Sequence, residues 1–254
     1  MRFSGPLLPF AAMLAMYAQS AQAGALRVMP VRVEVAAGRQ FCALTLGNDA
    51  DRPVTVQVRG FAWTRDDTGL DTLDPVDAPV VNPAIMTIPV GGSRLVRCSL
   101  PRQVSDGKSE QQWRLIVDEL PLPSSEVAPG TVQTLLRLSV PVFRTADHAK
   151  PQLEWSMQTL PDKAQILRIT NSGTRRTQVI RVMLHLRNGR DVPLDRSFYL
   201  LAKGAMILRV PTGIATEVLS VTAETDLGTL AVVSGSGSDG APDSKLALLR
   251  PSER

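Results

Sequence analysis

The stretch ALTLGNDADRPVTVQVR, residues 43–59, occurs a second time in the chain in altered form. It aligns without a gap on ILRITNSGTRRTQVIRV, residues 166–182, so that Asn48 falls on Asn171. In both copies a run of alternating apolar residues leads into a turn of Asn, Asp, Gly or Ser and out into a second run. Such self-similarity is typical of a protein built from repeated units. The pattern predicts that one strand–turn–strand unit is present twice.

A second pair of stretches follows in the same order. GGSRLVRCSLP, residues 91–101, resembles KGAMILRVP, residues 203–211, and places Arg97 on Arg209. A role that recurs in both copies indicates scaffold, so we interpret these two arginines as structural. The two pairs together predict two copies of one β-domain.

Period-2 alternation recurs in both halves, for example in VRVEV (31–35) and WRLIVDEL (113–120), with Pro and Gly between the runs. Many short strands with regular turns predict an all-β fold of two immunoglobulin-like antiparallel β-sandwich domains. We place the domains at residues 24–145 and 150–233. Residues 234–254 begin with SGSGSDG and are expected to form a flexible tail.

The N-terminus has the composition of a secretory signal. Arg2 precedes the apolar run LLPFAAMLAMYA (7–18), and Ala21-Gln22-Ala23 has the small-x-small pattern of a cleavage site. The run is about a dozen residues long, whereas a membrane-spanning helix needs about 20. Residues 1–23 are therefore predicted to be a removed signal peptide, and no later segment is long enough to span a membrane.

The composition argues against several functions. The net charge of +4 comes from 28 basic and 24 acidic residues that are not clustered, and 4% of residues are aromatic, so we expect no nucleic-acid binding. The chain has two histidines and no G-x-S-x-G, HExxH or phosphate-binding loop. Asp118 and Glu119 are neighbours on a predicted strand and face opposite ways. We therefore expect no enzyme activity and no cofactor.

Two cysteines, Cys42 and Cys98, lie 56 residues apart without a C-x-x-C motif or a nearby histidine. This spacing does not suit a metal site. In an oxidising compartment the two residues are candidates for a disulfide, and the alternative is a pair of buried thiols.

The stretch TLLRLSVPVF, residues 134–143, alternates like a strand but contains Pro141. Because proline lacks an N–H, it is largely confined to edge strands and strand ends. A long apolar edge is an aggregation hazard unless it is a working surface. Residues two apart share a face, which gives the stripe Val132, Leu136, Leu138 and Val140. A one-residue shift would bring in Leu135, and the alternative is that the stripe packs in its own core.

The order of several stretches resembles the periplasmic pilus-assembly chaperones of the chaperone–usher pathway, in the branch often called archaic. The stretches that carry the resemblance are VMPVRVEV (28–35), VTVQVRGFAWT (54–64), VVNPAIMTIPVGGSRLVRCSL (80–100), WRLIVDELP (113–121), LLRLSVPVF (135–143) and LEW (153–155). Together they cover most of the chain that follows the predicted signal peptide.

The resemblance implies two immunoglobulin-like domains set at an angle, in the periplasm, with a cleft for a partly folded pilus subunit. Such subunits lack their last strand, and the chaperone lends the last strand of its first domain to fill the gap. The resemblance also implies hand-over of the subunit to an outer-membrane usher, without nucleotide or metal.

The resemblance also implies basic side chains that hold the terminal carboxylate of the subunit. Arg32 matches the position of the arginine in the first strand. The lysine that the best-known branch carries late in the donor strand is absent here, where the sequence reads Ser139-Val140-Pro141. Arg114 is our candidate for the second anchor, and Arg137 is a weaker one.

Other features have structural interpretations. Trp63, Trp113 and Trp155 lie in strand-like contexts and are expected in the core or between the domains. Residues 65–82 are rich in Asp, Pro and Thr and are predicted to form a loop, a possible contact for the usher. Two alternative functions are a secreted adhesive or carbohydrate-binding module and a pilus subunit, but the chain has few aromatic residues and two predicted domains.

Overall fold

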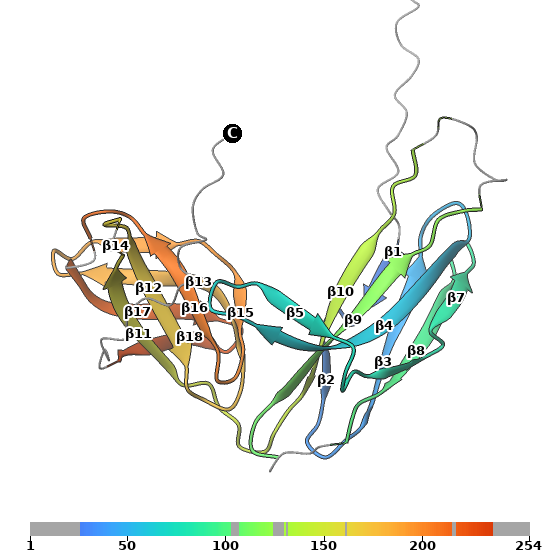
Figure 1. Ribbon diagram of the computed structural model, residues 1–254, viewed down its shortest axis with the longest axis horizontal. Helices are drawn as coiled ribbons and strands as arrows, with labels where there is room; N and C mark the ends of the chain where they lie inside the picture. Colours follow the sequence, from blue (N-terminus) through green and yellow to red (C-terminus); the bar gives the residue numbers. More distant parts are fainter. Residues whose placement is uncertain are drawn as a thin grey trace, which may run out of the picture.

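The computed structural model describes residues 26–102, 107–123, 130, 132–160, 162–214 and 217–235. The predicted signal peptide and nearly all of the predicted tail lie outside these residues. The regular elements are β-strands, which form two β-sandwiches set at an angle, as Figure 1 shows. The predicted all-β fold with two angled immunoglobulin-like domains is thereby confirmed. We call β1–β10 the first domain and β11–β18 the second, and the predicted boundary residues stay predictions.

The first domain contains two facing sheets, with strand orders β1-β3-β8-β6 and β2-β10-β9-β4-β5, and β7 pairs with β4. Its core includes Val56, Leu115 and Val142. The chain crosses from one sheet to the other between β1 and β2. The strands are β1 (Leu26–Met29), β2 (Val33–Val35), β3 (Phe41–Asn48), β4 (Val54–Arg65), β5 (Asp71–Asp74), β6 (Val80–Asn82), β7 (Ile85–Ile88), β8 (Ser93–Ser99), β9 (Gln111–Glu119) and β10 (Arg137–Arg144).

The strands of the second domain follow the order β14-β13-β17-β18-β11-β12-β16, and β15 pairs with β13. Its separate core includes Leu167, Val182 and Leu208. The strands are β11 (Leu153–Thr159), β12 (Gln165–Asn171), β13 (Thr177–Leu186), β14 (Asp191–Leu194), β15 (Phe198–Leu200), β16 (Ala205–Val210), β17 (Val218–Thr225) and β18 (Gly228–Ser234).

The sequence repeat corresponds to a repeated structure. Asn48 ends β3, is fully buried, and donates from its side-chain amide to the carbonyl of Arg52 at 2.8 Å. Asn171 ends β12, is equally buried, and donates to the carbonyl of Arg175 at 2.8 Å. Each amide also binds a carbonyl of a third segment of its domain. A buried amide needs such partners, so one asparagine closes the same turn in both domains.

The tryptophans lie where the sequence predicted them. Trp113 is in the first core, and Trp155 packs against the second. Trp63 forms a third cluster with Phe143 of β10 and Tyr199 of β15, and its ring centroid is 5.8 Å from that of Phe143 and 5.9 Å from that of Tyr199. This aromatic cluster joins the two domains.

The prediction of a loop over residues 65–82 was wrong, because this segment contains β5 and β6. β5 pairs with the end of β4, matching Ala62 with Asp74 and Arg65 with Asp71. All four residues of β5 are exposed, so the strand has no apolar face that alternation could reveal. β6 is three residues long and pairs with β8.

Cys42 and Cys98 form a disulfide in the structure. They lie directly opposite each other on β3 and β8, with their Cα atoms 4.9 Å apart.

Candidate functional site

The last strand of the first domain has an edge that is partly open. β10 pairs with β9 along its whole length, from Arg137 to Arg144. On its other side β2 pairs only with Val142, Phe143 and Arg144. No other strand in the described part of the chain pairs with residues 137–141 on that side. Five residues of β10 therefore form an edge without a strand partner, of which Arg137 and Ser139 are exposed and Val140 and Pro141 are buried.

The direction of the backbone groups follows from the ladder. The N–H of Glu119 donates to the carbonyl of Leu136 at 2.9 Å. Hydrogen-bonded pairs alternate along an antiparallel ladder, so Leu138, Val140 and Val142 also turn their backbone groups toward β9. The backbone groups of Arg137 and Ser139 point toward the open edge, and the carbonyl of Pro141 points to the same side, where β2 begins. Pro141 therefore removes no bond of the β9–β10 ladder, which explains a proline inside this strand.

The predicted apolar stripe differs in exposure along its length. Val132 is 89% exposed, Leu136 and Leu138 are half-buried, and Leu138 packs against the first core. Val140 is only 3% exposed and belongs to that core, so its assignment to a partner-facing stripe needs correction. Val140 lies closer to the end of β10 that β2 covers, and this part of the stripe is sealed within the domain. Leu135, the residue of the shifted register, is exposed.

The half-buried part of the stripe lies where the core reaches the surface. Leu26 and Val28 of β1 also pack against the first core and are only partly buried. β1 is the edge strand of one sheet, and β10 is uncovered at residues 137–141 in the other. The sandwich therefore presents partly buried apolar side chains from both sheets at their unpaired edges.

The sheet register brings Arg32 and Arg114 into one row. Arg114 lies opposite Pro141 on β9. The β2–β10 pairing begins with Val33 beside Val142, so Arg32 lies beside Pro141 on the other side. The two backbones are thus two strand spacings apart, about 10 Å. Neighbouring residues in β2 and β9 face the core, which places both arginines on the outer face of the sheet.

Arg114 is a buried cation with few partners. Its side chain is 11% exposed, and its guanidinium lies 3.7 Å from the ring centroid of Trp63. The nearest carboxylate is Asp71 at 3.6 Å, but Asp71 also accepts from Arg65 at 2.6 Å and from the indole of Trp63 at 2.8 Å. The Nε atom of Arg114 has no hydrogen-bond partner in the described chain. Burial lowers the pKa of Arg114, since Asp71 compensates its charge only in part.

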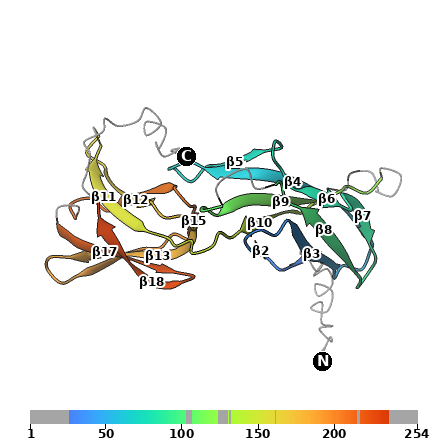
Figure 2. The same cartoon turned by 90° about the horizontal axis from the view of Figure 1, so that it is seen from below.

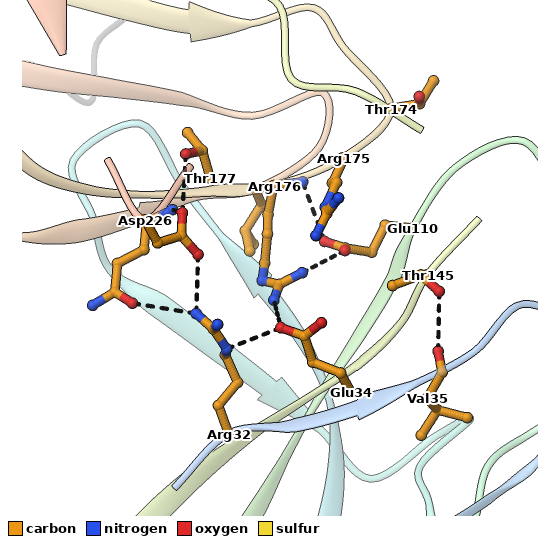
Figure 3. A network of polar contacts seen from close by, with 12 residues as sticks. Arg32, Glu34, Val35, Glu110, Thr145, Thr174, Arg175, Arg176, Thr177 and Asp226 are labelled. Atoms are coloured by element: carbon orange, nitrogen blue, oxygen red, sulfur yellow. Dashed lines mark hydrogen bonds and ion pairs between the residues drawn. The ribbon is translucent and has the colours of Figure 1, made fainter. Parts of the chain in front are cut away.

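Arg32 is more exposed and already paired. Its guanidinium lies 3.0 Å from Glu34 and 3.0 Å from Asp226, which is in the turn between β17 and β18. Figure 3 shows Arg32 between these two carboxylates. Burial alone would lower the pKa of Arg32, but a hydrogen bond with Tyr199 and the nearby carboxylates raise it. Arg32 thus keeps its charge and contacts the second domain.

Sequence reasoning missed Arg176, which is central to the contact between the domains. Its side chain is 2% exposed and binds Glu110, itself 1% exposed, at 2.5 Å, and Glu34 at 2.7 Å (Figure 3). Its guanidinium also lies 3.6 Å from the ring centroid of Phe143. The available signal was the repeat itself, because Arg176 aligns with Pro53 and so departs from the first copy.

Arg137, the weaker anchor candidate, has a different environment. Its side chain is 68% exposed and forms an ion pair with Asp118, which also binds Arg59 at 2.7 Å. The structure thus brings Arg32 and Arg114 together in one row and leaves Arg137 outside it. No group of three or more potential metal-ligating side chains occurs among the described residues. The same residues include no helix long and apolar enough to cross a membrane.

Comparison with known proteins adds independent evidence. Residues 25–148 match the family model of the pili and flagellar-assembly chaperone, PapD N-terminal domain. No protein of curated function matches the sequence.

Several solved structures share the fold. A chain of the CsuC–CsuE chaperone–tip adhesion subunit pre-assembly complex, from archaic chaperone–usher Csu pili of Acinetobacter baumannii, has a TM-score of 0.66 at 20% identity, over 83% of this chain and 99% of that one. A chain of the Salmonella enterica SafA pilin–SafB chaperone complex has a TM-score of 0.60 at 16% identity, over 84% and 98%. The CupB2 chaperone of Pseudomonas aeruginosa has a TM-score of 0.55 at 17% identity, over 82% and 100%.

The family model covers the domain that carries the open edge and both arginines, and the fold similarity extends over the second domain. Residues 25–148 are thus similar to the N-terminal domain of the pilus-assembly chaperones, and the whole described chain shares its two-domain fold with solved chaperone structures.

Proposed function

We propose that this protein is a periplasmic chaperone that captures pilus subunits by lending them the open edge of β10. The observation that carries the proposal is the position of Arg32 and Arg114, which lie in one row beside Pro141 where the open edge ends. The predicted signal peptide supports export, and the match of residues 25–148 to the pilus-chaperone family model supports pilus subunits as clients. Hand-over of the subunit to an outer-membrane usher belongs to the same proposal.

The backbone of β10 offers the main-chain part of the contact. A client segment that pairs with the open edge meets the N–H and C=O groups of Arg137 and Ser139. If the segment ends with its carboxylate at Arg32 and Arg114, it runs parallel to β10, as β2 does. The client strand therefore stops where β2 begins.

The apolar part of the contact comes from the exposed end of the stripe. Val132, Leu136 and Leu138 are available to fill the groove that a missing strand leaves in a subunit. Full burial of one such side chain contributes about 1.5–3 kcal/mol, and ordering of both partners offsets part of the sum. Val140 supports this surface from within the core of the first domain.

The carboxylate anchor follows from the charges. Arg114 has a buried positive charge with one shared counter-charge and a free Nε, so an incoming carboxylate compensates it. Arg32 offers a second guanidinium from the other side of Pro141. A paired buried charge fixes the register of the client more than it adds net affinity. We therefore assign the second anchor to Arg114 and not to Arg137.

The test is a substitution on the stripe, Leu136→Asp. This residue is half-buried at the edge, so we expect the chaperone to fold and to lose capture of a co-expressed pilus subunit, because a carboxylate cannot enter an apolar groove. The matched control is Leu219→Asp, at an exposed leucine of the second domain. Capture is measured as the one-to-one complex in size-exclusion chromatography. If Leu136→Asp captures the subunit as well as Leu219→Asp does, the open edge is not the binding surface.

A further inference from the structure

The hairpin of β4 and β5 extends from the first domain to the second. β4 pairs with β9 as far as Ala62 and continues to Arg65, and β5 returns beside this end. Figures 1 and 2 both show β5 between the two sandwiches. The hairpin therefore crosses from the domain that carries the open edge to the domain that does not.

The tip of this hairpin binds the edge strand β16 of the second domain. The carbonyl of Asp67 accepts a hydrogen bond from the N–H of Ile207 at 2.8 Å. The carboxylate of Asp67 lies 2.5 Å from Arg168 on the neighbouring strand β12. Gly69 has a φ of +92° and fits closely, since a Cβ atom there would lie 3.2 Å from the Cε of Met206. The tip is thus held by backbone, charge and packing contacts.

The base of the hairpin holds Arg114. Asp71 of β5 accepts from the indole of Trp63 and from Arg65 and lies 3.6 Å from Arg114. Arg65 also donates to the carbonyl of Tyr199 in the second domain at 3.1 Å. A chain of contacts therefore runs from the second domain through Arg65 and Asp71 to the candidate anchor.

We propose that the β4–β5 hairpin is a strut that sets the carboxylate anchor, with Asp71 as the positioning residue for Arg114. The inference rests on the proposed function, because Arg114 is an anchor only if a client carboxylate binds there. Arg32 binds the second domain directly through Asp226. Arg114 is linked to the second domain indirectly, through the hairpin. The spacing of the two arginines is therefore set by the docking of the second domain.

Loss of the contacts at the hairpin tip changes the position of Arg114, although Arg114 itself does not contact the tip. If the tip leaves β16, Arg65 is no longer held at Tyr199, and Asp71 moves with the hairpin. Arg114 then loses the nearby carboxylate of Asp71 and its fixed position over Trp63. The open edge of β10 stays as it is, because it belongs to the body of the first domain. We therefore expect loss of carboxylate selectivity and retention of strand binding.

The experiment uses a fluorescent peptide of alternating valine and serine, prepared with a free C-terminal carboxylate and with a C-terminal amide. Binding of both forms to the full chain is measured by fluorescence anisotropy. We expect the wild type to prefer the free acid by about tenfold or more, the size of a charge-assisted hydrogen bond. Gly69→Val pushes the tip from Met206, and we expect it to bring this ratio close to one with little change in amide binding.

Two further variants separate docking from folding. Gly91→Val is the matched control, because Gly91 also has a positive φ of +64° but has no heavy atom within 4 Å of an added Cβ. Arg168→Met leaves the hairpin sequence intact, removes the ion pair with Asp67, and should lower the ratio partway.

The outcomes distinguish the two proposals. A wild-type ratio near one contradicts the carboxylate anchor itself and so the proposed binding mode. A clear wild-type preference that persists in both Gly69→Val and Arg168→Met overturns the strut. Loss of the preference in these two variants but not in Gly91→Val supports it.

Discussion

Replacing Arg114 by methionine should separate client binding from stability. Arg114 and Arg176 are both buried and both lie over an aromatic ring, at 3.7 Å from Trp63 and 3.6 Å from Phe143. They differ in their acidic partners. Arg176→Met is therefore a matched comparison: it also removes a buried cation over an aromatic ring, but we expect a different change in the free energy of unfolding.

The magnitudes follow from what each substitution leaves behind. Arg176→Met leaves Glu110, 1% exposed, as a buried carboxylate without its cation, and such a loss costs about 3–5 kcal/mol. Arg114→Met leaves Asp71 still bound by Arg65 and Trp63. The variant loses a cation–π contact of about 0.5–2 kcal/mol but also the desolvation of a poorly compensated charge. We expect the stability of Arg114→Met to stay within about 1 kcal/mol of the wild type.

The effect of Arg114→Met on client binding should be larger than its effect on stability. A hydrogen bond to a charged group contributes about 1.5–3 kcal/mol, so Arg114→Met should weaken capture of a subunit by about 10- to 100-fold. Stability is measured by urea unfolding and affinity by titration with a purified subunit. If Arg114→Met unfolds as readily as Arg176→Met, Arg114 is a structural residue. If Arg114→Met binds the subunit as tightly as the wild type does, Arg114 is not an anchor.

Two further predictions test the edge and the disulfide. Ser139→Pro removes an N–H that points to the open edge, so capture in pull-down assays should fall while Ser139→Ala behaves like the wild type; equal capture by both would place the client elsewhere. Replacing both Cys42 and Cys98 by alanine releases a cross-link across 56 residues and should lower the free energy of unfolding by about 4 kcal/mol. Unchanged urea unfolding of this double variant would show that the cross-link does not stabilise the domain.

Features with a local signature could be predicted from the sequence. Asn48 and Asn171 each close a turn through a hydrogen bond to the carbonyl four positions later, and the turn and its flanking strands lie in one stretch of chain. Pro141 marked an edge because the missing N–H has a direct structural consequence. The two domains and the strand β10 therefore followed from the residues and from the family resemblance, whereas Arg32 and Arg114 were anchor candidates from the resemblance and stay a proposal.

Features that depend on distant contacts could not be predicted. The ion pair of Glu110 and Arg176 joins residues 66 positions apart, and nothing near either residue specifies the other. β5 gave no signal, because it has no buried side chain. Alternation assigns Val140 to a face of its strand but not to a depth, which depends on where β2 stops covering the edge. These contacts decide how the two domains meet and where the edge of β10 is covered.

The open edge of β10 has features that disfavour pairing with a second copy of the chain. The uncovered stretch is five residues long, carries a charged side chain at Arg137, and lacks one N–H at Pro141. Charge, proline and short length are the devices by which natural edge strands avoid pairing with other chains. For the same reasons, backbone pairing at this edge alone gives limited affinity for a client strand. Under the proposed function, selective capture then requires a second contact, and the arginine row at the end of the edge offers one to the terminal carboxylate of a client.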